Sequence, residues 1–375
     1  MKRVNLFKEL GITYKEDIIS NFLVTLLNQS SYFRESFLTR FLGIEEPRCF
    51  EVTTYTRIYT SVGIPDMISV IQNEEQCYLL LVENKLKADE GYQQTMRYAS
   101  ETCITEIKQK LNIKHEHVQV KLLFLTLVPE TIPTSPVFSN ISYEQLIKEI
   151  PPSIEDSGLN MLYEDFTSVL IDFYKDLDVT DNDLLFEKFT EETEAERLKI
   201  RFRKLMDSIS LDGTMLTRSP IGQVVGAGRI NYLVQFSKDS WKGEKVKKDE
   251  KGTYIVSGNT FDIHIECTFD VFNQTFTLPL HYETRPYLTK KQLKNAIGYD
   301  YYLKQRDEIK TVIHKKIKEQ NDTILSPYNG SNQIAYTKML LTEETTVKEF
   351  KEQLIRRVEK ITEVVDSALE EWKRG

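Results

Sequence analysis

Apolar residues in the first half of the chain recur first with the period of a helix and then with that of strands. The predicted elements, in chain order, are helices over 14–28 and 33–42, strands over 49–59, 64–71 and 77–82, a helix over 89–111, a strand over 120–128 and a helix that begins after Ser142. A short turn around Asn73 separates the second and third strands, which predicts a hairpin. Positions 79–82 are apolar without a break, as expected for a strand covered on both faces.

The second half of the chain has a different pattern. A helix is expected over 184–209, and two stretches around 261–267 and 276–283 then alternate between apolar and polar positions. This alternation predicts an antiparallel sheet with one face exposed to water. Pro279 indicates an edge strand, because proline has no N–H to donate to a neighbouring strand.

One long amphipathic helix is predicted near the C-terminus, over 346–372. Thr346 and Glu349 have the spacing of a capping box at its start. Its near-heptad spacing would also suit a homodimer, although packing on its own domain is the simpler interpretation.

Length and charge divide the chain further. Its 375 residues correspond to about two domains, and the net charge of −8 is concentrated in residues 151–200, which hold 14 acidic and 4 basic side chains. We interpret 151–210 as an acidic helical connector between an α/β domain over 1–150 and an α+β domain over 211–375. Nucleic-acid-binding proteins are usually basic, so a function on phosphates here requires a local cationic patch or metal ions.

The cysteines and the N-terminus bear on the compartment. Four cysteines, far apart and without a CxxC pair, indicate neither a disulfide framework nor a thiolate zinc site, and they favour a reducing environment. The basic first three residues are not followed by the apolar region of a signal peptide, and no apolar run approaches the roughly 18 residues of a membrane helix. We expect a cytoplasmic protein with no membrane partner.

The chemically informative residues lie at one end of the predicted hairpin, where Pro65-Asp66 lead into the first strand and Glu83-Asn84-Lys85 end the second. Side chains alternate across a strand, so Glu83 and Lys85 share a face and Asn84 points away. Strand pairing brings Asp66 alongside them. Two carboxylates about 4 Å apart repel by roughly 4 kcal/mol at an effective dielectric of about 20. The cluster therefore requires a cation, and oxygen ligands favour Mg²⁺ or Mn²⁺.

This arrangement resembles the PD-(D/E)XK nuclease superfamily, with Pro65-Asp66 as the PD and Glu83-Asn84-Lys85 as the (D/E)XK. The resemblance covers about residues 5–150. It implies an α/β fold with a restriction-endonuclease-like core, in which a mixed sheet is flanked by helices.

Two further features extend the resemblance. Gln94 and Tyr98 fit the QxxxY element of the lambda exonuclease-like branch; they are one helical turn apart, about 6 Å along the axis, and would face the same site. Glu16 stands where many members carry an additional acidic ligand. The alternatives are a Tyr98 that belongs to the core, and a Glu16 that is favoured at a helix N-terminus by the helix dipole.

What the resemblance implies is metal-dependent hydrolysis of a phosphodiester. Lys85 would orient or deprotonate the attacking water. The Mg²⁺ or Mn²⁺ ion would be held by Asp66, Glu83 and the carbonyl of Asn84, with Glu16 at a second metal position. No further cofactor is required. The resemblance favours DNA over RNA, and restriction, repair or anti-phage defence enters by analogy.

Two groups of histidines are further candidates. His115-Glu116-His117 resembles a ligand pair, but it lies in a polar turn, and a solvated loop is the favoured interpretation. The second group occupies polar positions of the predicted sheet: His264, Glu266, His281 and Glu283. These side chains would meet as a second metal site or form a plain polar face, and the plain face is the favoured interpretation.

The α+β domain is expected to recognise the substrate or a partner protein. Trp241 and Tyr287 are candidates for stacking on bases, beside lysine-rich segments at 242–251, 290–294 and 315–318. Lysine-rich turns are ordinarily solubility features. Two alternatives remain to the enzyme: a nuclease fold without catalysis that binds nucleic acid or protein, and a subunit whose acidic surface binds a partner. The intact Asp66, Glu83 and Lys85 favour the enzyme.

Overall fold

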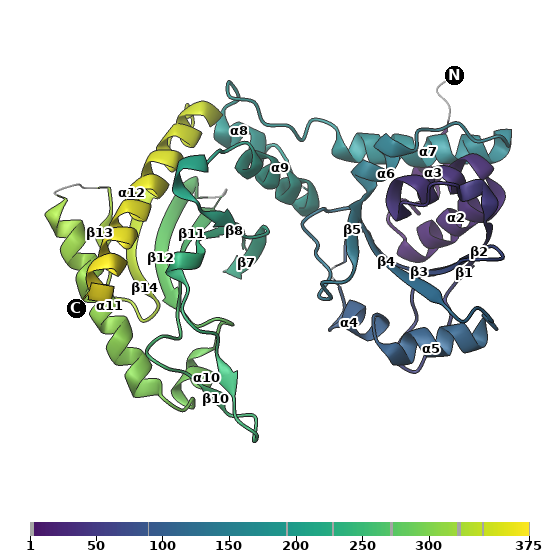
Figure 1. The fold of residues 1–375 in the computed structure, drawn as a ribbon. Helices are drawn as coiled ribbons and strands as arrows, with labels where there is room; N and C mark the ends of the chain where they lie inside the picture. The colour runs from purple at the N-terminus through teal and green to yellow at the C-terminus, as the bar shows by residue number, and fades with distance from the viewer. Residues whose placement is uncertain are drawn as a thin grey trace. The chain divides into compact units, whose positions relative to one another are not determined.

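The computed structural model describes residues 4–88, 90–192, 194–226, 229–270, 273–320, 324–339 and 341–374. These residues fall into two compact units, divided between Leu177 and Asp178 (Figure 1). We call them unit 1 and unit 2. Within the described ranges, no helix combines the length and the apolar character needed to cross a lipid bilayer.

Unit 1 is built on a mixed sheet, whose described strands have the order β1-β2-β3-β4-β5. The strands are β1 (Glu51–Thr56), β2 (Met67–Gln72), β3 (Cys77–Lys85), β4 (Val118–Thr126) and β5 (Ser139–Ser142). The pairs β1–β2 and β2–β3 are antiparallel, whereas β3–β4 and β4–β5 are parallel. The β2–β3 pair is the predicted hairpin, and β3 is central and buried, as its uninterrupted apolar run predicts.

Helices cover both faces of this sheet (Figure 1). Tyr98, Cys103 and Ile107, on α4 and α5, pack against one face, and α2 contacts β1, β2 and β3 from the other. The helices are α1 (Leu6–Glu9), α2 (Glu16–Gln29), α3 (Ser31–Leu42), α4 (Gln94–Tyr98), α5 (Glu101–Lys110), α6 (Tyr143–Glu149) and α7 (Ser157–Tyr174). The expected mixed α/β sheet with flanking helices is thus confirmed.

The helix expected over 89–111 is in fact two helices, α4 and α5. The side chain of Ser100 accepts a hydrogen bond from the backbone N–H of Cys103 and starts α5 as its N-cap. Asp89, the expected start, lies outside the described residues. Ser142 caps α6 as predicted, with Gln145 completing a capping box. The short strand β5 was not expected from the sequence.

The acidic segment 151–210 is divided between the two units. Phe166 of α7 packs against Phe7 with ring centroids 5.4 Å apart, so α7 belongs to unit 1. The next helices, α8 (Leu185–Thr190) and α9 (Ala195–Asp207), contribute to the core of unit 2. We predicted a separate connector here, but each helix has an apolar stripe that is buried in the core of its own unit.

Unit 2 is built on an antiparallel sheet, whose described strands follow the order β13-β14-β12-β11-β8-β6, with β7 also paired to β8. The strands are β6 (Thr217–Arg218), β7 (Gly222–Gly226), β8 (Arg229–Ser237), β11 (Asp262–Asp270), β12 (Thr275–Glu283), β13 (Ser326–Pro327) and β14 (Gln333–Met339), with β9 (Lys247–Lys248) and β10 (Tyr254–Ile255) forming a separate pair. Its other helices are α10 (Lys290–Lys294), α11 (Tyr299–Glu319) and α12 (Val347–Arg374). Helices α8 and α9 replace the single helix expected over 184–209.

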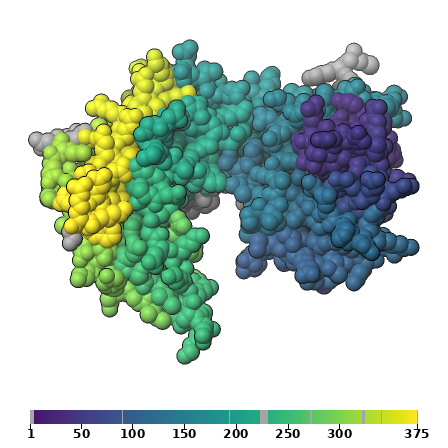
Figure 2. Space-filling view, in the orientation of Figure 1, coloured from purple at the N-terminus to yellow at the C-terminus, as the bar shows by residue number. Residues whose placement is uncertain are grey.

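The long C-terminal helix is confirmed as α12, and the capping box of Thr346 and Glu349 is present. Its apolar stripe packs on its own unit: Phe350 meets Phe276 of β12 with ring centroids 4.9 Å apart. The outer face of α12, coloured yellow, lies at the surface of unit 2 (Figure 2). Because the apolar stripe of α12 is buried in unit 2, the fold supports the simpler interpretation, in which this helix packs on its own domain.

Two expectations for unit 2 are wrong. Strand β12 lies between β11 and β14, so Pro279 does not mark an edge; the β11–β12 ladder is interrupted between the pairs Ile265–Leu280 and Thr268–Thr277, which accommodates the missing N–H. Trp241 is fully buried and its Nε1 donates a hydrogen bond of 2.8 Å to Asp366 of α12. Stacking of this side chain on a base is therefore excluded.

Asp366 joins α12 to the segment around Trp241, because its other oxygen accepts a hydrogen bond of 2.6 Å from the buried Lys238. Replacing Asp366 with Ala leaves a buried ammonium and a buried indole N–H without this partner, and we expect the free energy of unfolding of unit 2 to fall by about 2 kcal/mol. Denaturant unfolding followed by tryptophan fluorescence measures the change. Glu370→Ala, at an exposed position of the same helix, is the control. An Asp366→Ala protein as stable as this control would contradict the prediction.

Candidate active site

Strand pairing brings the predicted site residues together at one end of the β2–β3 hairpin. Asp66 immediately precedes β2, and Glu83, Asn84 and Lys85 are the last residues of β3. Met67 pairs with Val82, so Asp66 lies opposite Glu83. The backbone N–H of Asn84 donates a hydrogen bond of 2.8 Å to Oδ2 of Asp66, which fixes this carboxylate beside the end of β3.

Lys85 lies among the carboxylates. Its Nζ is 2.7 Å from Oε1 of Glu83 and 3.6 Å from Oε2 of Glu16. Glu16 is the first residue of α2, and its Oε1 also accepts a hydrogen bond of 3.1 Å from the backbone N–H of Leu86. The carboxylate is thereby held at the end of β3. The ammonium of Lys85 thus lies between the carboxylates of Glu83 and Glu16.

Burial makes this cluster electrostatically unusual, because Glu83 is 1% exposed and Lys85 8%. Burial and the nearby charge of Asp66 raise the pKa of Glu83 to about 8, although Lys85 opposes the shift. Burial also raises the pKa of Asp66, against the hydrogen bond from Asn84 and the charge of Lys85. For Lys85, burial disfavours the ammonium, but the carboxylates of Glu83, Asp66 and Glu16 outweigh it and raise the pKa.

The side chain of Asn84 points to the opposite face of β3, as strand alternation predicts. Its Nδ2 donates to Oγ of Ser20 at 3.0 Å, and its Oδ1 accepts from the hydroxyl of Tyr143 at 2.8 Å. These contacts fix the backbone between Glu83 and Lys85. Sequence reasoning missed Ser20 and Tyr143, because nothing in the local sequence around either one indicates a contact with a residue about sixty positions away.

Gln94 and Tyr98 contact each other, and Tyr98 contacts the segment that leads to Asp66. Nε2 of Gln94 donates to the Tyr98 hydroxyl at 3.1 Å. This hydroxyl donates to the carbonyl of Ile64 at 2.9 Å and accepts from the N–H of Ile64 at 3.2 Å. The pair therefore positions the backbone two residues before Asp66. Oε1 of Gln94 accepts from the N–H of Gly91 at 3.2 Å.

Gly63 is a further residue that this arrangement requires. Its φ is +145°, which L side chains rarely adopt, and an added Cβ would lie 2.7 Å from Cε1 of Tyr98. The ring of Tyr98 thus packs directly on the glycine backbone. The glycine three residues before Asp66 could be noticed in the sequence, but the sequence did not indicate which ring packs on it.

One feature of the site indicates that it suits a divalent cation. Both carboxylate oxygens of Glu83 are buried, and neither accepts a hydrogen bond of good geometry, even though Nζ of Lys85 lies close to Oε1. A buried carboxylate in this state gains from an additional cationic ligand. With the carboxylate of Asp66 opposite, the donors are hard oxygens, which suit Mg²⁺ or Mn²⁺.

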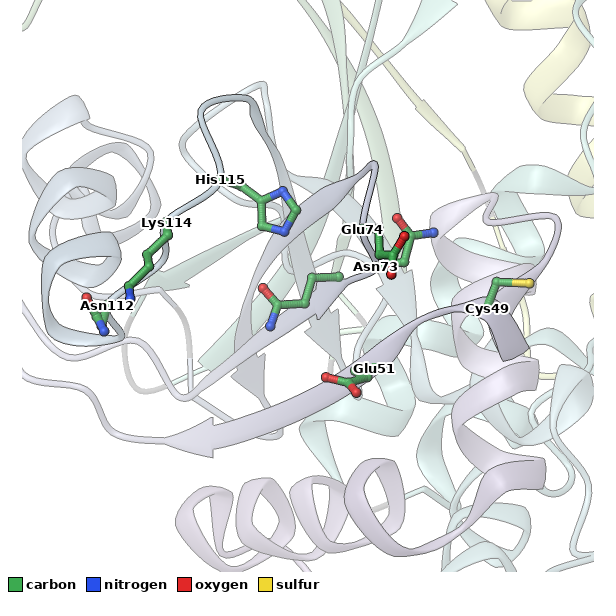
Figure 3. Close-up of a pocket in the computed structure, with 8 residues that line it drawn as sticks. Cys49, Glu51, Asn73, Glu74, Asn112, Lys114 and His115 are labelled. Atoms are coloured by element: carbon green, nitrogen blue, oxygen red, sulfur yellow. The ribbon is translucent and has the colours of Figure 1, made fainter.

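A separate pocket of about 520 Å³ lies at the other end of the hairpin (Figure 3). Gln72 and Asn73 line it, together with Glu51, Lys114 and His115. The register of the hairpin places Gln72 opposite Cys77, at the far end of β2 and β3 from Asp66. His115 and His117 lie in the loop between α5 and β4, as the loop interpretation predicts.

A comparison with known protein families identifies this unit. Residues 4–156 match the sequence model of the PD-(D/E)XK nuclease superfamily. The N-terminal unit belongs to the PD-(D/E)XK nuclease superfamily. No curated protein and no solved structure is significantly similar to the chain.

The match to the PD-(D/E)XK superfamily covers the sheet and α1 to α6, and it ends immediately before α7. Members of this superfamily are generally phosphodiesterases that use divalent metal ions. The expected resemblance over about residues 5–150 is thus confirmed. The predicted motif residues Asp66, Glu83 and Lys85 converge within the matched region.

A first prediction concerns the packing of Tyr98 on Gly63. Gly63→Ala forces the ring away from Ile64, and we expect the free energy of unfolding of unit 1 to fall by about 1–3 kcal/mol together with weaker Mn²⁺ binding. Thermal unfolding and Mn²⁺ titration measure the two effects. Gly213→Ala, whose Cβ would meet no atom within 4 Å, controls for the loss of a glycine. Unchanged Mn²⁺ affinity in a folded Gly63→Ala protein would argue against a positioning role for Tyr98.

A second prediction follows from the pKa of Glu83 in metal-free protein. That pKa is about 8 in the folded state, against about 4.3 for an unfolded glutamate. The folded state therefore binds more protons between these values, and its free energy of unfolding falls as the pH rises through them. Glu83→Gln cannot ionise, so in the presence of EDTA its Tm should exceed that of the wild type at about pH 8 and match it at about pH 4.

The measurement is thermal unfolding across this pH range with chelator present throughout. Glu74→Gln, at an exposed position of the β2–β3 turn, is the matched control and should follow the wild type. A Glu83→Gln protein that melts below the wild type at about pH 8 would show that Lys85 stabilises the ionised carboxylate more than burial penalises it.

Proposed function

We propose that the chain is a metal-dependent nuclease that hydrolyses phosphodiester bonds, with DNA preferred over RNA. The observation that carries this proposal is the pairing of two buried carboxylates, Asp66 and Glu83, with the ammonium of Lys85 at the end of a hairpin in a nuclease-superfamily domain. A solvent-facing salt bridge would have been the ordinary interpretation of an E-x-K sequence. Burial of Glu83 argues against that reading.

The roles of the residues follow from their positions. The Mg²⁺ or Mn²⁺ ion would be held by Asp66, Glu83 and the backbone carbonyl of Asn84. When bound, such an ion polarises the phosphoryl oxygen, acidifies water and neutralises charge on the transition state. Lys85 orients or deprotonates the attacking water through Nζ, which lies beside the carboxylates of Glu83 and Glu16. The charge of the bound ion would lower the raised pKa of Lys85, as deprotonation of that water requires. Glu16 is placed to contribute to a second metal position.

Gln94 and Tyr98 act as positioning residues in this proposal. Their hydrogen bonds run to each other and to the backbone of Ile64. The orientation of the PD segment therefore depends on them. The spacing of this pair supports assignment to the lambda exonuclease-like branch of the superfamily.

Unit 2 is proposed to contact the substrate or a partner protein. Tyr287 is 56% exposed, and three exposed lysines of α10 follow it in sequence: Lys290, Lys291 and Lys294. An exposed ring beside ammonium groups suits single-stranded nucleic acid. Lys315 and Lys316 are less suited, because Glu371 of α12 pairs with both. A homodimer or a partner protein remains the alternative for this unit, and restriction, repair or anti-phage defence is the proposed setting by analogy.

The test is incubation of the full chain with labelled linear and circular DNA and RNA in Mg²⁺ or Mn²⁺. We expect cleavage that EDTA abolishes and that Asp66→Ala or Lys85→Ala lowers by about 100-fold or more, because each removes charge stabilisation at the reacting phosphate. Circular substrates separate endonuclease from exonuclease activity. Lys114→Ala, at the opposite end of the hairpin in the pocket of Figure 3, should retain wild-type activity.

Two outcomes would overturn the assignment. Metal-dependent cleavage that survives both substitutions would place the chemistry elsewhere. Salt-dependent binding of DNA without cleavage under any metal would favour a nuclease fold that only binds nucleic acid.

A further inference from the structure

A second group of potential metal ligands lies on the sheet of unit 2. His264 of β11 and His281 of β12 are direct partners in the antiparallel ladder, and Glu283 follows His281 by two residues. Because side chains alternate along a strand, all three project from the same face of the sheet. The opposite face carries the apolar side chains of the core.

The three side chains converge. One ligand atom from each lies within 4.8 Å of the others, and the two imidazole rings have centroids 5.5 Å apart. Nδ1 of His281 is 3.4 Å from Oε1 of Glu283. Ligands at about 2.0–2.2 Å from a tetrahedral ion are about 3.4 Å apart, so this pair already has the separation that a shared ion requires. A ligand atom of His264 lies within 4.8 Å of the ligand atoms of this pair.

The group is also withdrawn from solvent, contrary to the exposed face expected from the sequence. The side chains of His264, His281 and Glu283 are 7%, 17% and 15% exposed.

Outer contacts orient the three side chains. Oδ1 of Asp262 lies 3.7 Å from Nδ1 of His264, and Nδ2 of Asn332 donates to Oε1 of Glu283 at 3.1 Å. Gln235 of β8 lies with its Nε2 3.3 Å from Nε2 of His264. The amide nitrogen of Gln235 can only donate a hydrogen bond, so Nε2 of His264 accepts it and carries the lone pair.

We propose that unit 2 binds a divalent transition metal ion of the Zn²⁺ class through His264, His281 and Glu283. Two imidazoles and one carboxylate are ligands typical of zinc, whereas Mg²⁺ prefers oxygen donors. Three protein ligands leave a fourth position for water or another ligand. The site is separate from the carboxylate cluster of unit 1 and does not depend on the proposed nuclease activity.

The test uses the full chain without a histidine tag, stripped with chelator and dialysed against Zn²⁺ or Co²⁺ in excess Mg²⁺. The Mg²⁺ occupies hard oxygen sites, including the one proposed in unit 1. Bound metal is measured by mass spectrometry, and Co²⁺ coordination by its visible absorption. We expect one tightly held equivalent of Zn²⁺ or Co²⁺ per chain.

His281→Ala and Glu283→Gln should each weaken this binding by about 100-fold or more, since even changes in residues behind the ligands cost about 10–100-fold. His117→Ala removes an exposed histidine outside the cluster, and Asp66→Ala changes the other proposed site; both should bind the ion as the wild type does. Asp262→Asn should weaken binding by about 10-fold. Circular dichroism of each metal-free variant establishes that it is folded.

Zinc should also raise the Tm of the wild type and of the Asp66→Ala protein, but not that of Glu283→Gln. Glu283→Gln preserves the size of the side chain, so the comparison does not depend on the survival of an alanine variant. The proposal is overturned if the wild type retains no ion in excess Mg²⁺. It is equally overturned if folded His281→Ala and Glu283→Gln proteins retain the ion with wild-type affinity.

Discussion

The confinement of like charges at the end of the β2–β3 hairpin is the constraint on which the proposed activity of unit 1 depends. Glu83 and Asp66 face each other at the end of the hairpin, and Nζ of Lys85 lies 2.7 Å from the buried Glu83. Removing such charged groups from water costs more free energy than their mutual attraction recovers, unless the geometry is very good. The raised pKa of Glu83 expresses this imbalance. A site of this kind is maintained at the expense of stability by the sheet and helices around it.

The surrounding structure holds the cluster from both faces of β3. On one face, Tyr98 fixes the backbone before Asp66 and packs on Gly63. On the other, Asn84 is tied to Ser20 of α2 and to Tyr143 of α6. Contacts on both faces of the sheet therefore hold the charged residues at the end of β3 in place together. A small displacement of α2 or α6 would be transmitted to the carboxylates through the hydrogen bonds of Asn84.

The sequence allowed the site of unit 1 to be predicted because its determinants are local. Asp66, Glu83 and Lys85 lie on adjacent strands of a hairpin, so the strand period alone determines which side chains meet. The errors in strand order and register concern non-local features. The sheet order, which places Pro279 in an interior strand, depends on the return of β14 from far along the chain. The convergence of His264 and His281 depends on the register between β11 and β12, which the alternation of apolar and polar residues does not determine.

The aromatic packing of α7 has a consequence for how the limits of the nuclease domain are drawn. The family match ends at residue 156, yet Phe166 of α7 contacts Phe7, Phe22 and Tyr143, with ring centroids 5.4, 5.7 and 5.8 Å apart. A fragment cut at the end of the match would uncover this aromatic patch, a surface prone to association. It would also loosen the tyrosine that anchors Asn84. The compact unit extends through Leu177, and a helix beyond the family match packs against the aromatic residues behind the motif.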